Sequence, residues 1–131
     1  MTQENWISRF LNSHNDSVII GSLGNISEIL EKLDNGKNKI ITVKGAMGCV
    51  MGIGLGYALN TEKQVYVLIG DGAFLMKAGS LATIAKYNPG NLQVIILNNN
   101  KHESCGGQPT SYKFFKNGKI HFKWLRTENI T

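Results

Sequence analysis

A run of apolar residues that ends in Gly-Asp-Gly constrains the fold of this chain more than any other stretch. Five apolar, mostly β-branched residues occupy positions 65–69, and Gly70-Asp71-Gly72 follows them directly. Such a run indicates a strand buried in a sheet, and the glycines indicate a tight turn at its end. Residues 73–86 then have helical periodicity. The sequence therefore predicts a carboxylate at the carboxyl end of a strand, which is where α/β sheets bind ligands.

The predicted turn has the chemistry of a magnesium site. Free N–H groups at the start of the following helix would favour a phosphate, which the Asp71 carboxylate would repel unless a cation lay between them. The next predicted strand ends in Asn98-Asn99-Asn100. Parallel neighbours would bring these amide oxygens beside Asp71, and carboxylate, amide and phosphate oxygens together suit Mg²⁺. An ordinary turn and an ordinary polar loop would explain either motif taken alone.

Helical and strand-like segments alternate along the chain. Apolar periodicity predicts helices over 3–14, 26–33, 46–60 and 73–86, and strands over 17–21, 39–43, 65–69 and 92–97. Such alternation predicts a mainly parallel sheet with right-handed crossovers, in an α/β protein of three layers, α/β/α. The length of 131 residues with 42% hydrophobic content favours a single domain, 1–131.

The helix predicted over 46–60 carries glycines at a spacing of four, namely Gly48, Gly52 and Gly56. Each glycine inside a helix costs about 1 kcal/mol relative to alanine. We therefore expect this glycine face to pack closely against a neighbouring element. The stretch is not a dinucleotide-binding fingerprint, because its glycines would lie within a helix rather than at a strand-to-helix turn.

The last residues, 111–131, have a different character. They hold five Lys or Arg residues against one acid, which accounts for +4 of the net charge of +5. Apolar alternation around Asn117-Gly118 predicts a basic β-hairpin over 112–124. No nucleic-acid-binding motif accompanies the charge, so we expect a solvated basic tail and no nucleic-acid partner.

Features that report on the compartment favour a cytoplasmic protein. Cys49 and Cys105 lack metal-ligand spacing and are expected to be free thiols of a reducing compartment. No basic-then-apolar leader is visible at the amino terminus. The longest apolar stretch, 45–59, is shorter than the ~20 residues of a membrane span, so no membrane partner is expected.

Three motifs together carry a resemblance to a known family. They are Gly45-Ala46-Met47-Gly48-Cys49, Gly70-Asp71-Gly72-Ala73 with the later asparagines, and the segment 103–110, Glu-Ser-Cys-Gly-Gly-Gln-Pro-Thr. In this combination, over residues 17–110, the chain resembles the diphosphate-binding domain of the thiamine-diphosphate-dependent 2-oxoacid decarboxylases. Among these, it is most similar to the phosphonopyruvate decarboxylases and to the β subunits of sulfopyruvate decarboxylases.

The resemblance implies particular site residues. Asp71 and Asn99 would bind Mg²⁺ through their side chains and Lys101 through its main-chain carbonyl, with Asn98 or Asn100 replacing Asn99 if the register shifts. Thiamine diphosphate would contact these three residues and seven more: Ser22, Leu23, Gly45, Met47, Gly72, Ala73 and His102. Met47 would hold the cofactor in its bent conformation, although packing in a helix core would also explain it. The resemblance assigns no catalytic residue, His102 and Glu103 included.

The resemblance also implies a divided active site. The glutamate that activates the cofactor belongs to a pyrimidine-binding domain, so we expect a complementary subunit or domain in a hetero- or homo-oligomer. The implied function is the thiamine-diphosphate- and Mg²⁺-binding half of a decarboxylase acting on phosphonopyruvate or sulfopyruvate. The alternatives are a component of an acetolactate-synthase-like carboligase and a truncated, non-catalytic remnant. The remnant is considered because the family continues after Gly-Gly-Gln with an apolar helix and a strand, where this chain is expected to form the basic hairpin.

Overall fold

The computed structural model describes residues 1–102, 106–113 and 122–131. The helices are α1 (Gln3–Ser13), α2 (Asn25–Leu33), α3 (Val50–Leu59), α4 (Asp71–Met76) and α5 (Ser80–Tyr87). The strands are β1 (Val18–Gly21), β2 (Lys39–Thr42), β3 (Val65–Gly70), β4 (Leu92–Asn98), β5 (Lys101–His102), β6 (Gln108–Pro109) and β7 (Leu125–Asn129).

Five of the strands form one sheet in the order β2-β1-β3-β4-β7, and every neighbouring pair is parallel. The short strands β5 and β6 form a separate antiparallel pair. The central strands β3 and β4 are almost wholly buried, because helices cover both faces of the sheet. The predicted three-layer α/β/α fold is therefore confirmed.

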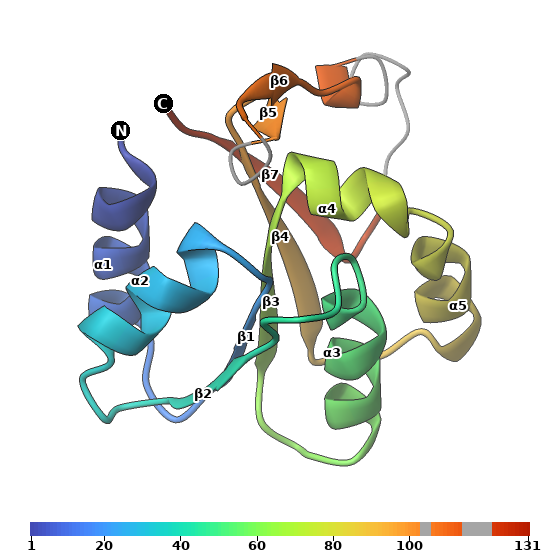
Figure 1. Ribbon diagram of the computed structural model, residues 1–131. Helices are drawn as coiled ribbons and strands as arrows, with labels where there is room; N and C mark the ends of the chain where they lie inside the picture. The colour runs from blue at the N-terminus through green and yellow to red at the C-terminus, as the bar shows by residue number, and fades with distance from the viewer. Residues whose placement is uncertain (103–105, 114–121) are drawn as a thin grey trace.

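The helices divide into two layers (Figure 1). Helices α1 and α2 cover one face, where Phe10 and Leu30 pack with Ile19 and Leu68 of the sheet. Helices α3, α4 and α5 cover the other face in the larger of the two apolar cores. Within the described ranges, none of the helices has the length and apolar character that a bilayer crossing needs.

Two predicted helices differ from the observed ones. The helix expected over 46–60 begins only at Val50. Before it, Gly48 has a positive φ of +80, and residues 46–49 form a turn in which the Cys49 N–H donates to the Ala46 carbonyl at 3.1 Å. The helix expected over 73–86 is divided into α4 and α5. The residues between them make shorter-range bonds, such as the Ser80 N–H to the Lys77 carbonyl at 2.9 Å, which turn the chain.

The predicted hairpin is not seen where the structure describes its ends. Its turn at Asn117-Gly118 lies outside the described residues, but Tyr112 is helical and Trp124 lies in a turn. Their aromatic side chains are buried: the Tyr112 ring packs edge-on against Phe74, and the Trp124 indole donates to the Pro89 carbonyl at 3.0 Å. At the described ends of this segment, the aromatic side chains therefore pack against the rest of the domain. After it, β7 adds a fifth parallel strand beside β4, which the sequence analysis did not predict.

The predicted glycine face is only partly correct. A Cβ on Gly48 would lie 2.6 Å from Lys77 Cγ and 2.9 Å from the Ala73 oxygen, so Gly48 does allow a close approach to α4. Gly52 and Gly56 face open space, and Gly54 is the glycine that packs on the sheet. The thiol of Cys49 is exposed and free as expected, whereas Cys105 lies outside the described residues.

Candidate functional site

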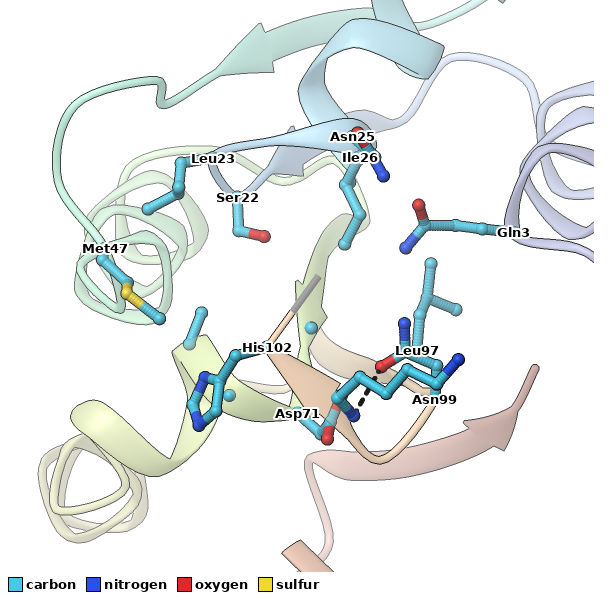
Figure 2. A pocket seen from close by; sticks show the side chains of 14 residues that line it. Gln3, Ser22, Leu23, Asn25, Ile26, Met47, Asp71, Leu97, Asn99 and His102 are labelled. Carbon is cyan, nitrogen blue, oxygen red and sulfur yellow. Dashed lines mark hydrogen bonds between the residues drawn. The ribbon is translucent and has the colours of Figure 1, made fainter. Parts of the chain in front are cut away.

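A pocket lies at the carboxyl ends of β1, β3 and β4 (Figure 2). Nine of the ten predicted cofactor residues line it: Ser22, Leu23, Met47, Asp71, Gly72, Ala73, Asn99, Lys101 and His102. Gly45 is not among the lining residues. The parallel register explains the convergence, since Gly21 pairs with Leu68 and Gly70 with Leu97, so the residues after each strand meet at one edge.

Asp71 is the acidic residue at the base of the pocket. It is the first residue of α4, directly after the last residue of β3, and only 1% of its surface is exposed. The hydroxyl of Thr110 donates a hydrogen bond to its Oδ2 oxygen. A buried carboxylate is costly unless it has such a partner. The fold therefore holds a negative charge at the end of the central strand and directs it toward the pocket.

The three consecutive asparagines have different roles. Asn98 is buried; its amide donates to Asn129 Oδ1 of β7 at 3.1 Å, and its oxygen accepts from the Asn100 N–H at 3.2 Å. Asn99 lines the pocket, and its Oδ1 accepts from the Lys101 N–H at 3.0 Å. Asn98 and Asn100 are not lining residues, and Asn100 turns the chain with φ +61. The geometry thus favours Asn99 over its two neighbours as the residue available to a ligand.

Met47 lies in the turn before α3, outside the helix in which it was expected. It is half-buried, packs against the larger apolar core and also lines the pocket. In Figure 2 its side chain points into the space between Leu23 and His102. Met47 therefore has the core contact of the alternative explanation, although not within a helix, together with a position at the pocket wall.

His102 covers the first turn of α4. A Cβ placed on Gly72 would lie 2.6 Å from His102 Nδ1 and 2.9 Å from its Cε1, closer than real carbon atoms approach. Gly72 is therefore required for the imidazole to take this position. The antiparallel pairing of His102 with Gln108 holds the short strand that carries the ring.

The sequence analysis missed five residues that line the pocket. They are Gln3, Asn25, Ile26, Gly70 and Leu97. Four of them lie within three residues of a predicted site residue, so the position of a strand end could have indicated them. Gln3 carries no such signal, because α1 reaches the pocket only through its packing on the sheet.

The donors at the pocket fit a hard divalent cation. No group of three His, Cys, Asp or Glu side chains that could hold a metal occurs among the residues that the structure describes. What the pocket offers is oxygen, from the Asp71 carboxylate and the Asn99 amide, and Mg²⁺ prefers oxygen ligands with further oxygens from phosphates or water. The amide oxygen of Asn99 has two lone pairs, so its bond to Lys101 leaves one for a ligand.

The charges around the pocket are few. Among the described lining residues, Asp71 is the single acid, and Lys101 and His102 are the side chains able to carry positive charge. A doubly negative ligand would therefore find little positive charge among the described residues that line this pocket. A metal ion or a second protein surface would have to supply the remaining positive charge.

Comparison with known proteins identifies a family for this chain. The sequence profile of the thiamine pyrophosphate enzyme C-terminal TPP binding domain matches residues 20–126. Phosphonopyruvate decarboxylase of Streptomyces viridochromogenes is 43% identical over 95 residues, which are 72% of this chain and 24% of that protein. Sulfopyruvate decarboxylase subunit beta of Methanothermobacter thermautotrophicus is 38% identical over 104 residues, 79% of this chain and 56% of that protein. The chain thus spans about a quarter of the first relative and about half of the second.

Proposed function

Because this chain belongs to the thiamine pyrophosphate enzymes, as their C-terminal TPP-binding domain, we propose that it is the Mg²⁺- and cofactor-binding half of a 2-oxoacid decarboxylase. The observation that carries the proposal is the convergence of nine predicted residues on one pocket. These residues come from separate segments of the chain and meet where α/β sheets bind ligands.

The proposed roles follow the positions of the residues. Asp71, Asn99 and the carbonyl of Lys101 would hold Mg²⁺, and Gly72 and Ala73 would approach the diphosphate of the cofactor. Ser22 and Leu23, on the loop after β1, would approach it from the other side of the pocket (Figure 2). Thiamine diphosphate, when bound, supplies the sink for the electrons that are released with CO₂. The residues of this chain would position it and exclude water, with Met47 supporting its bent shape.

We infer that the substrate is a 2-oxoacid with a second acidic group, phosphonopyruvate or sulfopyruvate. The names of the relatives support this choice. Lys101 and His102 are the described lining residues able to contribute positive charge toward such a group. Since they are few, part of the recognition of the second acidic group would come from a partner.

We propose that the partner is a pyrimidine-binding subunit or domain that carries the activating glutamate. Helix α3, Val-Met-Gly-Ile-Gly-Leu-Gly-Tyr-Ala-Leu, has no charged residue, yet Gly52, Gly56 and Leu59 are exposed. A helix that is apolar on all sides is normally buried. Covering this face with a partner would complete both the burial of α3 and the active site.

The substitution Asp71→Asn tests the cofactor site. It keeps the size of the side chain and removes the charge, so the rise in melting temperature caused by Mg²⁺ with thiamine diphosphate should vanish. For the wild-type chain that rise corresponds to about 2.7 kcal/mol when the ligand is at 100 times its Kd. Asp34→Asn is the matched control, because Asp34 is exposed and its Oδ1 accepts a hydrogen bond from the Gly36 N–H, which an asparagine oxygen can also accept. Undiminished stabilisation in Asp71→Asn would refute the assignment.

Turnover tests the divided site. The purified chain, with Mg²⁺, thiamine diphosphate and either 2-oxoacid, should release no CO₂ by itself and should release it once the pyrimidine-binding partner is added. Decarboxylation by the isolated chain would contradict the need for a partner. Formation of a ligated product in place of the aldehyde would favour the carboligase alternative, and inactivity with a competent partner would favour the remnant.

A further inference from the structure

Thr110 lies beside the predicted metal ligand Asp71 but belongs to a distant segment. It follows β6, 39 residues after Asp71, and is 7% exposed. Its hydroxyl donates a hydrogen bond to Asp71 Oδ2. Among the described residues, Thr110 is the residue whose side chain forms a hydrogen bond with the Asp71 carboxylate. The hydrogen bond occupies one oxygen of the carboxylate and leaves Oδ1 for a cation.

The same residue also contacts the second ligand segment. The Thr110 N–H donates to the Asn100 carbonyl at 3.0 Å, next to Asn99. One residue therefore links, through its hydroxyl and its backbone, the turn that holds Asp71 and the loop that holds Asn99. The opposite side of the loop is fixed by Asn98, whose amide donates to Asn129 Oδ1.

From these contacts, we propose that Thr110 is a positioning residue for the magnesium site. It fixes the rotation of the Asp71 carboxylate and the separation between Asp71 and Asn99, so that both oxygens are arranged before the metal arrives. A site arranged in advance does not lose side-chain freedom on binding, and partners that orient metal ligands commonly contribute 10- to 100-fold in affinity. The inference rests on the proposed function, since it assumes that Asp71 and Asn99 bind Mg²⁺.

The substitution Thr110→Val removes the donor and keeps the shape of the side chain. Binding of Mn²⁺, as a spectroscopic replacement for Mg²⁺, is measured by electron paramagnetic resonance with saturating thiamine diphosphate. We expect Thr110→Val to weaken metal binding by about 10- to 100-fold. Thr110→Ser, which restores the hydroxyl, should bind nearly as tightly as the wild type.

Thr127→Val is the matched control, because the Thr127 hydroxyl bonds to the Tyr112 hydroxyl rather than to Asp71. It should leave metal affinity unchanged. If Thr110→Val does not fold, the pair Thr110→Ala and Thr110→Ser, which differ only in the hydroxyl, gives the same comparison. Melting temperatures without metal or cofactor separate a loss of folding from a loss of binding.

The outcomes separate this inference from the proposed function. If the wild type binds Mn²⁺ and Thr110→Val binds it equally well or more tightly, Thr110 does not position Asp71 and the inference is overturned. Equal losses in Thr110→Val and Thr110→Ser would also overturn it, because the hydroxyl would then be irrelevant. If the wild type itself does not bind the metal with thiamine diphosphate, the magnesium site is overturned and this inference with it.

Discussion

The three glycines inside α3 should respond in opposite ways to substitution by alanine. A Cβ on Gly54 would lie 2.3 Å from Val67 Cγ2 and 3.4 Å from Leu92 Cδ1. On Gly52 and Gly56 a Cβ would meet nothing within 4 Å, and both residues are exposed. One helix therefore contains a glycine needed for packing and two that the isolated chain does not need.

The magnitudes follow from these contacts. Gly52→Ala and Gly56→Ala should each stabilise the isolated chain by up to about 1 kcal/mol, the difference in helix propensity between the two residues. Gly54→Ala gains the same propensity but overpacks the core, which costs about 1–3 kcal/mol. Val67 is fully buried and its β-branched side chain is stiff. We therefore expect a cost in the upper part of that range and a net loss of about 1–2 kcal/mol for Gly54→Ala.

Urea denaturation of the isolated chain measures these differences through the midpoint at constant slope. The reasoning is refuted if Gly54→Ala is as stable as the wild type, or if Gly52→Ala unfolds more easily than the wild type. The same variants test the proposed partner surface. Gly52→Ala and Gly56→Ala should weaken assembly with the pyrimidine-binding partner while stabilising the free chain, a combination that general damage to the fold would not produce.

Two further predictions concern the pocket and its surroundings. Asn99→Ala should weaken Mg²⁺ binding with little loss of stability. Asn98→Ala should instead cost about 1–3 kcal/mol of folding free energy, because it removes the hydrogen bonds of a buried side chain. Metal titration measures the first effect and urea unfolding the second. Burial, aided by the charge of Asp71, raises the pKa of Tyr112 above its ordinary value of 10.0, although its bond to Thr127 opposes this. The unfolded chain therefore loses the phenol proton first, so stability should fall as the pH rises above about 10, and Tyr112→Phe should make this fall shallower in urea unfolding at increasing pH.

The sequence predicted the elements whose signals are local. The strand before Asp71 is an unbroken apolar run because it is buried on both faces, and the glycines beside Asp71 mark its end. Strand β7 could not be recognised in this way. Leu125–Asn129 lies at the edge of the sheet and is only partly buried. It also carries Arg126 and Glu128, which form an ion pair of 2.9 Å with each other. Its assignment depends on pairing with β4, which no local pattern encodes.

The residues of the candidate site also divide into those with a local sequence signal and those that depend on long-range contacts. Asp71 and Asn99 could be predicted because each follows a recognisable strand. The role of Thr110 could not, because it depends on a contact between residues 39 positions apart. Gln3 is a similar case, since only the packing of α1 brings it to the pocket. Sequence motifs thus indicated the residues that we propose to meet the ligand, whereas the contact of Thr110 with Asp71 and the position of Gln3 at the pocket needed the structure.

Described residues after β6 form hydrogen bonds with Asp71 and with Asn98. Thr110 bonds to Asp71, the Tyr112 hydroxyl bonds to Thr127 of β7, and Asn129 of the same strand accepts from Asn98. The Asn129 contact connects β7 to the loop that carries Asn99, whereas the Thr127–Tyr112 bond involves neither predicted ligand. Because buried polar groups that lose a partner pay the cost of desolvation, loss of the Asn129 side chain would affect Asn98, and through it the loop that carries Asn99. The basic tail predicted from composition, 111–131, therefore includes Asn129, the partner of the buried Asn98 that precedes the proposed ligand Asn99.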